Sequence, residues 1–378
     1  MDFELPADDD PRRLAVRAWL AEYPDPTPDD LQAAGYVVPH WPAPWGLGAD
    51  PVHQLVIDEE LTTAGVARPD NPIGIGWAGP TLLAAGTEAQ KQRWLPPLLT
   101  AREFWCQLFS EPEAGSDLAN LRTSAVLDGD TWVVNGSKIW SSYANHSDFG
   151  ILLARTDAAA PKHKGISYFV LPMDTPGIEV RPIIEMTGGN HFNECFFTDV
   201  RIPADYLVGQ PGEGWRLANV TLANERVSLS TGGVLWSMGP TTDEVLDVAR
   251  RRGGIADPVL RQHAAQVHTE AVLLRLLGYR VLTAMVKGVA PGPEVSVKKA
   301  LADDHGQHVF DLALALAGAD ALTTDWGPGG APADNPWGTW HWGAMFSRAL
   351  TIGGGTSEVQ RNIIGERLLG LPREPQRS

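Results

Sequence analysis

The hydrophobic pattern changes its period twice along the chain, and this restricts the fold more than any other feature. Residues 11 to 99 carry helical periodicity broken by prolines, as in "GTEAQKQRWLPPLL", where Thr87 and Gln90 have capping-box spacing. Residues 106 to 211 carry short alternating runs with turn signals, such as Asp128-Gly129-Asp130 between two runs typical of strands. Long helical patterns return after Trp215. We therefore expect the order α, β, α.

The charge balance narrows the choice of partners. At 378 residues the chain has a net charge of −16, which argues against nucleic acid or an anionic membrane surface as a partner. Its two cysteines, Cys106 and Cys195, provide neither a disulfide framework nor a metal cluster. The acidic start "MDFELPADDD" lacks the pattern of a signal peptide, and no apolar run has the length of a membrane span. These features lead us to expect a cytoplasmic protein.

Two motif matches are rejected on their context. Gly74-Ile-Gly-Trp-Ala-Gly79 fits the dinucleotide fingerprint, but prolines bracket it and no strand is predicted before it. Asp303, Asp304, His305 and His308 could face a metal from one helix, but no further ligand group accompanies them, so we expect a solvated helical face. Patterns typical of hydrolases, nucleoside triphosphatases and zinc sites are not found in the sequence.

Three consecutive glycines precede a predicted helix in "TIGGGTSEVQR", residues 351 to 361. Ser357 and Gln360 have capping-box spacing, which predicts that the helix starts there. Glycine is unfavourable unless something must approach the backbone closely. The glycines therefore indicate either that a ligand or another side chain occupies the missing Cβ volume, or that this is a flexible turn.

The most informative segment runs from residue 107 to 157. Ser110, Ser116 and Ser142 supply hydroxyl groups, Gly115 permits close approach of the backbone, and Trp140 offers a flat apolar face. These residue types suit a planar heterocycle with several hydrogen-bonding edges. A serine-rich loop with one core tryptophan is the alternative reading of the same residues.

The order and spacing of these residues resemble the acyl-CoA dehydrogenase family, whose members carry "T/S-E-P-x-A-G-S-D" followed by "G-x-K-x-W". Here the segment reads "SEPEAGSD" and then "GSKIW", and the similarity continues in "FNECFFTDVRIPADYLVGQPGEGW" and "GGGTSEVQRNIIGERLLGLPR". The resemblance implies an α+β fold with an N-terminal helical domain (1–105), a middle β-barrel-like domain (106–213) and a C-terminal four-helix bundle (214–378). It agrees with the α, β, α order expected above.

The resemblance also implies FAD as cofactor and an acyl-CoA thioester as substrate. The family reaction removes the α-proton with a carboxylate while a hydride passes from the β-carbon to flavin N5. By position, Ser116 and Arg226 would contact the substrate. The residues implied to hold the flavin are Phe109, Ser110, Gly115, Ser116, Trp140, Ser142, Thr356 and Glu358, the last two approaching from the C-terminal domain.

The catalytic base is the main departure from the common pattern. Many members place it in "Y-E-G-T", where this chain has Gly353-Gly354-Gly355-Thr356. A second group, similar to isovaleryl-CoA and long-chain acyl-CoA dehydrogenases, carries the base on an earlier helix, and here "LANERVSLS" has Glu225 at that position. The resemblance implies that Glu225 is the base and that the Gly354 N–H donates to the thioester oxygen. A surface glutamate paired with a nearby arginine is the plain alternative.

Contacts to the adenosine end of FAD are also altered. In the family a neighbouring subunit supplies "R-x-x-F-G" and "Q-x-x-G-G" steps, of which this chain keeps Arg251 and Gly318. This is similar to subunits of actinobacterial heteromeric acyl-CoA dehydrogenases, so we expect a heteromer with a second acyl-CoA dehydrogenase-like subunit, or else a homo-oligomer. The expected electron acceptor is an electron-transfer flavoprotein. A flavin oxidase or monooxygenase of the same fold, and a non-catalytic partner subunit, are the alternative functions.

Overall fold

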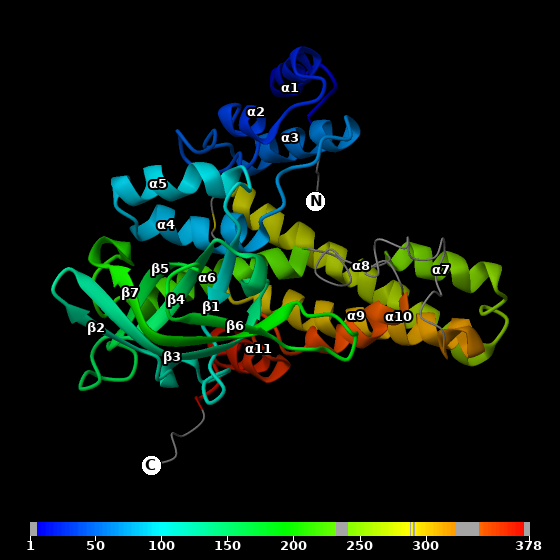
Figure 1. Ribbon diagram of the computed structural model, residues 1–378. Helices are drawn as coiled ribbons and strands as arrows, with labels where there is room; N and C mark the ends of the chain where they lie inside the picture. The colour runs from blue at the N-terminus through cyan, green and yellow to red at the C-terminus, as the bar shows by residue number, and fades with distance from the viewer. Residues whose placement is uncertain (1–5, 232–240, 288, 290–291, 323–339, 374–378) are drawn as a thin grey trace. The chain divides into compact units, whose positions relative to one another are not determined.

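The computed structural model describes residues 6–231, 241–287, 289, 292–322 and 340–373 (Figure 1). Its internal contacts divide the chain into two compact units. The first comprises Met1–Ile183 and Asn190–Thr221, and the second comprises Ile184–Gly189 and Leu222–Ser378. Helices come first, then a sheet, then helices again, which confirms the α, β, α order.

The first unit begins with helices separated by proline-containing loops. They are α1 (Pro11–Glu22), α2 (Pro28–Ala33), α3 (Pro51–Thr63), the π-turn η1 (Gly74–Ala78), α4 (Gly79–Ala85) and α5 (Glu88–Leu99). The predicted capping box is confirmed, because Thr87 and Gln90 bond each other's backbone N–H at the start of α5. The fingerprint-like glycine motif forms η1 and runs directly into α4, so it does not lie between a strand and a helix as the dinucleotide fingerprint requires.

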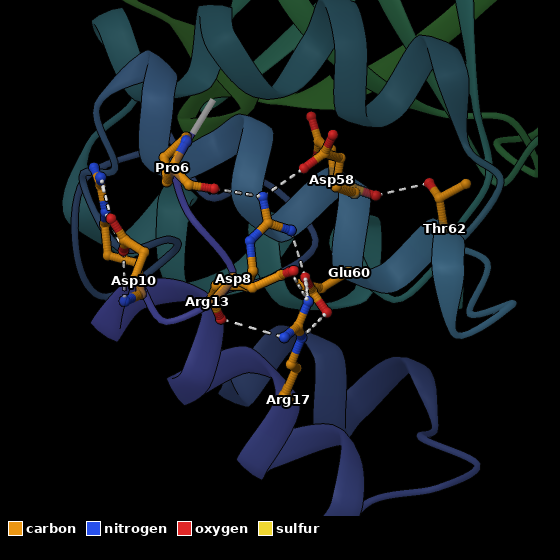
Figure 2. Close-up of polar contacts among 10 residues, drawn as sticks. Pro6, Asp8, Asp10, Arg13, Arg17, Asp58, Glu60 and Thr62 are labelled. Atoms are coloured by element: carbon orange, nitrogen blue, oxygen red, sulfur yellow. Dashed lines mark hydrogen bonds and ion pairs between the residues drawn. The ribbon is translucent and has the colours of Figure 1, made fainter. Parts of the chain in front are cut away.

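Charged side chains fasten α1 to α3 (Figure 2). Glu60 is buried, and its carboxylate accepts from Arg13 and, with both oxygens, from Arg17 at 2.8 and 3.0 Å. Arg13 also donates to Glu59 at 2.7 Å. The hydrogen bond from Arg17 lowers the pKa of Glu60 in spite of burial. The two arginines therefore keep a buried carboxylate charged and fix the packing of these two helices.

A mixed sheet follows the helices in the first unit. Its strands are β1 (Trp105–Leu108), β2 (Ser124–Asp128), β3 (Thr131–Ser142), β4 (Phe149–Arg155), β5 (Ile166–Pro172), β6 (Ile178–Pro182), β7 (Phe192–Pro203) and β8 (Leu207–Val208). They are ordered β6-β7-β3-β2-β4-β5-β8, with β1 pairing with β4. The predicted hairpin is confirmed, because β2 and β3 pair antiparallel with Asp128 opposite Thr131.

Helix α5 packs on the sheet within this unit. Gln90 donates its side-chain amide to the backbone carbonyls of Asp205 and Leu207, at 2.7 and 2.8 Å. Trp94 meets Trp105 of β1 edge to face, with ring centroids 6.4 Å apart. Both indoles are buried, and the residues of β4 are buried on both faces of the sheet along nearly its whole length. The sheet therefore forms the core that positions the loops at its edges.

Three buried hydroxyls connect α4, β5 and α6 (Gly214–Thr231). The Thr221 hydroxyl lies 2.8 Å from that of Thr81 and 3.2 Å from that of Tyr168. All three side chains are fully buried. The hydroxyls bond one another here without any charge, and they hold the first half of α6 to α4 and β5 within the first unit.

The second unit is helical in the part that the structure describes. Its elements after α6 are α7 (Thr242–Arg251), α8 (Pro258–Val286), α9 (Val295–Ala317), α10 (Trp340–Phe346), α11 (Ser357–Ile363) and the π-turn η8 (Ile364–Leu368). The two long helices α8 and α9 run side by side, and α10 and α11 pack against α9 (Figure 1). Among the described residues, no helix has the length and apolar character that crossing a membrane requires.

Candidate active site

The loop after β1 and the end of β3 lie together in the first unit. The Ser110 carbonyl accepts from the Ile139 N–H at 2.9 Å, and the Phe109 carbonyl accepts from the Lys138 ammonium at 2.9 Å. These bonds bring the two motif segments quoted above side by side. Ser110, Trp140 and Ser142 are thereby held on neighbouring stretches of backbone.

A buried ion pair joins the same two segments. Lys138 donates to the Glu111 carboxylate at 2.8 Å, and Glu111 also accepts from the backbone N–H groups of Arg122 and Thr123, at 2.6 and 2.9 Å. The Lys138 side chain is fully buried. Both residues lie inside the motifs, yet residue types alone did not single them out, because Lys and Glu are usually exposed.

The pair is charged at neutral pH. Burial lowers the pKa of the Lys138 ammonium to about 8, against the opposite effect of the Glu111 carboxylate. Burial would raise the pKa of Glu111, but the Lys138 charge and the Arg122 N–H outweigh it, so that this pKa is below its usual value. One ion pair thus joins the loop after β1 to the end of β3, the two segments that carry candidate flavin residues of the first unit.

Trp140 is the most unusual residue of this group. It lies at a bulge in the β3–β7 pairing, between Lys138 and Ser141, with φ at 61°. A positive φ costs a non-glycine residue roughly 1–2 kcal/mol. Trp140 is 58% exposed, and its ring meets Phe192 edge to face, with centroids 6.1 Å apart. The alternative that Trp140 is a core residue is therefore wrong. Its side chain is exposed to solvent, and its backbone has a strained conformation.

The other predicted flavin residues differ in exposure. The Phe109 ring is buried against Tyr168, so only its backbone remains available to a cofactor. Gly115 and Ser116 are exposed, and a Cβ added to Gly115 would meet no protein atom within 4 Å. Ser142 is half-buried opposite Phe192. An exposed ring, nearby hydroxyls and an unobstructed glycine fit a planar group with polar edges.

Glu225 lies on the part of α6 that belongs to the second unit. It is only 6% exposed, which excludes the reading of a surface glutamate. Arg226 is half-buried, and burial lowers its pKa; the Arg367 charge acts in the same direction and the Glu225 charge opposes both. A buried carboxylate next to a half-buried guanidinium is an arrangement that functional sites favour.

The glycine turn before α11 has a left-handed backbone. Gly354 and Gly355 have φ values of 68° and 92°, and a Cβ on Gly355 would lie 2.7 Å from the Gln360 amide nitrogen. The buried Lys299 ammonium donates to the carbonyls of Gly353 and Gly355, at 2.7 and 3.1 Å. Backbone conformation and these contacts require glycine here, and a merely flexible turn does not describe them.

The predicted cap of α11 is wrong by one residue. The Thr356 hydroxyl, and not Ser357, accepts at the helix start, from the Val359 N–H at 3.3 Å. Gln360 does not complete a capping box, because its amide donates to the carbonyls of Gly354 and Gly355, both at 3.1 Å. Gln360, for which the spacing predicts a capping role, instead holds the glycine turn through these two hydrogen bonds.

Glu358 and Arg251 are exposed and paired within their own helices. Glu358 lies 3.7 Å from Arg361, and Arg251 lies 2.9 Å from Asp247 on α7. Glu358 has a lowered pKa, caused first by its backbone hydrogen bond at the helix start. Both charges therefore remain accessible to a ligand or another subunit.

The face expected to be solvated on α9 is partly buried, so that expectation is wrong. Asp303 pairs with Lys299 one turn earlier on the same helix. His305 is buried, with one ring nitrogen 3.1 Å from Glu270 and the other 2.9 Å from Thr242. Neighbouring helices α7 and α8 supply these partners, which periodicity on α9 cannot reveal. Among the described residues no group of three or more histidine, cysteine, aspartate or glutamate side chains that could hold a metal ion is present.

Comparison with known proteins identifies the family along nearly the whole chain. The domain descriptions that match are "Acyl-CoA dehydrogenase, N-terminal domain" for residues 10–102, "middle domain" for 106–200 and "C-terminal domain" for 212–369. The solved steroid ACAD Tcur3481-Tcur3483 has a TM-score of 0.79 at 30% identity and covers 99% of this chain and 100% of its own. The ChsE4-ChsE5 complex from Mycobacterium tuberculosis has a TM-score of 0.77 at 30% identity, with the same coverage.

Curated relatives give the same result. Acyl-CoA dehydrogenase FadE34 of Mycobacterium tuberculosis is 42% identical over 344 residues, covering 91% of this chain and 46% of FadE34. This chain thus spans less than half of that relative. Acyl-CoA dehydrogenase IpdE1 of the same organism is 39% identical over 345 residues, covering 91% of this chain and 87% of IpdE1. The protein therefore belongs to the acyl-CoA dehydrogenase family, whose members are FAD-dependent flavoproteins with this three-domain architecture.

Proposed function

We propose that this chain is the catalytic subunit of an FAD-dependent acyl-CoA dehydrogenase in which Glu225 is the base. The Glu225 carboxylate takes the α-proton of an acyl-CoA thioester, and the product is the trans-2-enoyl-CoA. Bound FAD supplies the acceptor for the hydride that leaves the β-carbon. The Gly354 N–H donates to the thioester oxygen as negative charge develops there, and Arg226 and Ser116 contact the substrate.

One observation carries the assignment of the base. Glu225 is buried on α6, while the position that holds the base in many relatives is Gly354, whose φ of 68° disfavours any side chain. This chain has no glutamate at position 354, and a glutamate placed there would have a strained backbone. The position of the buried Glu225 carboxylate next to the half-buried Arg226 supports a catalytic role, because such groups gather at functional sites.

The cofactor roles complete this proposal. Trp140 would stack on the flavin, with Ser110, Ser142 and the backbone at Phe109 and Gly115 along its polar edges, and with Thr356 and Glu358 contributing from the C-terminal domain. Arg251, exposed on α7, would reach the adenosine end of FAD in another subunit. The domain boundaries that accompany these roles are 1–105, 106–213 and 214–378.

A heteromer and a bulky acyl group belong to the same proposal. Two solved structures similar to this chain are described as two-component assemblies, and one of them as a steroid ACAD. We therefore propose a second acyl-CoA dehydrogenase-like subunit as partner, an acyl-CoA with a steroid side chain as substrate, and an electron-transfer flavoprotein as acceptor. Two buried cysteines without a disulfide support a reducing, cytoplasmic location.

The test is flavin reduction by a panel of thioesters under anaerobic conditions. Octanoyl-CoA, isobutyryl-CoA and the CoA thioester of a steroid side-chain acid are added to the flavin-loaded protein, alone or with its partner, while the flavin band is followed. We expect Glu225→Gln to slow bleaching about 10³-fold without loss of FAD. The exposed Glu179, paired with Arg181, gives the matched control Glu179→Gln, which should bleach at the wild-type rate.

Three results would refute the proposal in different ways. Full turnover by Glu225→Gln would exclude this base. Rapid oxygen consumption without an added acceptor would favour the oxidase or monooxygenase alternative. An absence of flavin reduction in every assembly would indicate a non-catalytic subunit.

A further inference from the structure

Lys299 is buried beneath the glycine turn and makes contacts that its position on α9 does not require for helix formation. Its side chain is 1% exposed. The ammonium donates to the carboxylate of Asp303 and to the carbonyls of Leu350, Gly353 and Gly355, the last three at 3.0, 2.7 and 3.1 Å. Three of these four acceptors come from the backbone that leads into α11, so the lysine organises the turn.

The hydrogen bonds fix the direction of peptide groups in the turn. In a trans peptide the C=O of one residue and the N–H of the next point in opposite directions. The only cis bond among the described residues precedes Pro44, so the Gly353–Gly354 peptide is trans. Because the Gly353 carbonyl points to the Lys299 ammonium, the Gly354 N–H points away from it.

Gln360 fixes the next peptide group from the other side. Its side-chain amide, which is fully buried, donates to the Gly354 carbonyl at 3.1 Å. The carbonyl groups of Gly353, Gly354 and Gly355 are thus all bonded to Lys299, to Gln360 or to both. With every carbonyl of the turn fixed, the orientation of the Gly354 N–H is set as well.

Stability alone does not explain a lysine at this position. A buried ion pair is often no more stabilising than apolar residues of similar size, because both charges lose their hydration. A buried ammonium with several carbonyl acceptors does, however, specify one arrangement of the backbone that holds them. The choice of Lys299 and Asp303 therefore points to the geometry of the turn.

We propose that Lys299 is a positioning residue for the thioester oxygen: it binds the Gly353 and Gly355 carbonyls and so aims the Gly354 N–H at the substrate. The inference rests on the proposed function, in which Gly354 is a donor to that oxygen. It adds that the donor's direction is set by a side chain on α9, with Gln360 as the second support. A preorganised donor of this kind stabilises charge that develops in the transition state.

The test removes the lysine without leaving a buried charge behind. In Lys299→Met/Asp303→Leu both members of the pair become apolar, which should preserve folding. We expect kcat for flavin reduction to fall about 100-fold, with KM changed only a few-fold and FAD content unchanged. A purely structural role would lower the unfolding midpoint but leave kcat of the folded fraction at the wild-type value.

The direct readout is the stretching frequency of the bound thioester carbonyl. The panel member that bleaches the flavin fastest is labelled with ¹³C at its carbonyl carbon and bound to Glu225→Gln, which should turn it over about 10³-fold more slowly than the wild type. Infrared difference spectra should show the carbonyl band shifted to lower frequency with Lys299 present and near its solution value with the double substitution added. An equal shift in both proteins, or none in either, would overturn the proposal.

Two more variants keep the test decisive. Asp303→Asn retains Lys299 and its carbonyl contacts, so the infrared shift should persist. If the double variant does not fold, Lys299→Arg keeps the charge but displaces the turn, and it should lose most of the shift; an unchanged shift would count against the inference. Turnover by Glu225→Gln would refute the proposed base and leave the infrared comparison to judge Lys299 separately.

Discussion

Lys138 in the first unit and Lys299 in the second are both buried and both bonded to a carboxylate. Lys138 also donates to one backbone carbonyl and Lys299 to three. Their partners differ in origin. Lys138 pairs with Glu111, which lies on a separate segment, whereas Lys299 pairs with Asp303 on its own helix. The first pair therefore joins the loop after β1 to strand β3 through both charges, whereas the second pair contacts the glycine turn through the ammonium alone.

The pKa values of the two paired carboxylates, Glu111 and Asp303, are shifted in opposite directions. Glu111 accepts two backbone N–H groups besides its lysine, and its pKa is lowered. Asp303 is raised to a pKa of about 7 by burial, in spite of the Lys299 charge. In both pairs the lysine opposes the effect of burial on the carboxylate's pKa. It outweighs burial at Glu111, where backbone N–H donors act in the same direction, and it does not outweigh burial at Asp303.

The largest expected loss of stability comes from removing the lysine of the Lys138–Glu111 pair. Lys138→Met leaves the Glu111 carboxylate buried without its cation, so we expect a loss of about 3–5 kcal/mol in the free energy of unfolding, measured with urea. The exposed Lys162, which pairs with Asp117, offers a control, and Lys162→Met should cost at most about 1 kcal/mol. Equal losses in the two variants would remove the distinction between the buried and the exposed pair.

The Lys299–Asp303 pair predicts that the free energy of unfolding depends on pH between about 4 and 7. The pKa of Asp303 is about 7 in the folded state and 3.8 in its ordinary state, so the folded protein binds more protons between these values. Stability attributable to Asp303 therefore falls as pH rises from about 4 to 7, by an upper bound of about 4 kcal/mol. The difference between wild type and Asp303→Asn, followed by urea unfolding across this window, should change by that sign. A difference independent of pH would contradict the raised pKa.

The first pair predicts the opposite slope at alkaline pH. The pKa of Lys138 falls from 10.5 to about 8 on folding, so the unfolded chain binds more protons between these values. Stability attributable to Lys138 rises over this window, by at most about 3 kcal/mol. Comparing wild type with Lys138→Met from pH 8 to 10.5 isolates this contribution, and a falling difference would show the sign to be wrong.

The smallest expected changes in the free energy of unfolding concern two residues with positive φ, Trp140 in the first unit and Gly354 in the second. Trp140 has a positive φ without being glycine, so Trp140→Gly should stabilise the flavin-free protein by up to about 1 kcal/mol and weaken FAD binding about tenfold. Gly354→Ala should do the reverse to stability, costing roughly 1–2 kcal/mol. Thermal unfolding and FAD titration measure both. If the two substitutions shifted stability in the same direction, positive φ would not be the controlling factor.

The sequence predicts the elements of this protein better than its buried polar contacts. Helical periodicity, the Thr87 cap and the hairpin at Gly129 follow from local rules, and the structure confirms them. Glu225 was found only through resemblance, because nothing local distinguishes a buried glutamate from an exposed one. The prediction of a solvated face at Asp303 and His305 is wrong, because the helices that cover α9 are distant in sequence.

The helix-capping error has a similar origin. Spacing favoured Ser357 and Gln360, but Gln360 has a competing use in bonding the carbonyls of the glycine turn. Glu111 and Lys138 were visible inside conserved-looking motifs, yet only the sheet brings them together, since they are far apart along the chain. Contacts made across the fold are the part that local patterns do not encode.

The hydroxyl cluster around Thr221 has a consequence for anyone who redesigns this enzyme. Thr221 and Glu225 are four residues apart on α6 and both are buried, so they share one side of the helix. A shift of one residue along α6 turns a side chain by about 100° and advances it by about 1.5 Å. Inserting or deleting a single residue between the threonine and the glutamate would therefore redirect the carboxylate while the anchoring hydroxyls stay in place. Along this one helix, the direction of the Glu225 side chain relative to Thr221 depends on the number of residues between them.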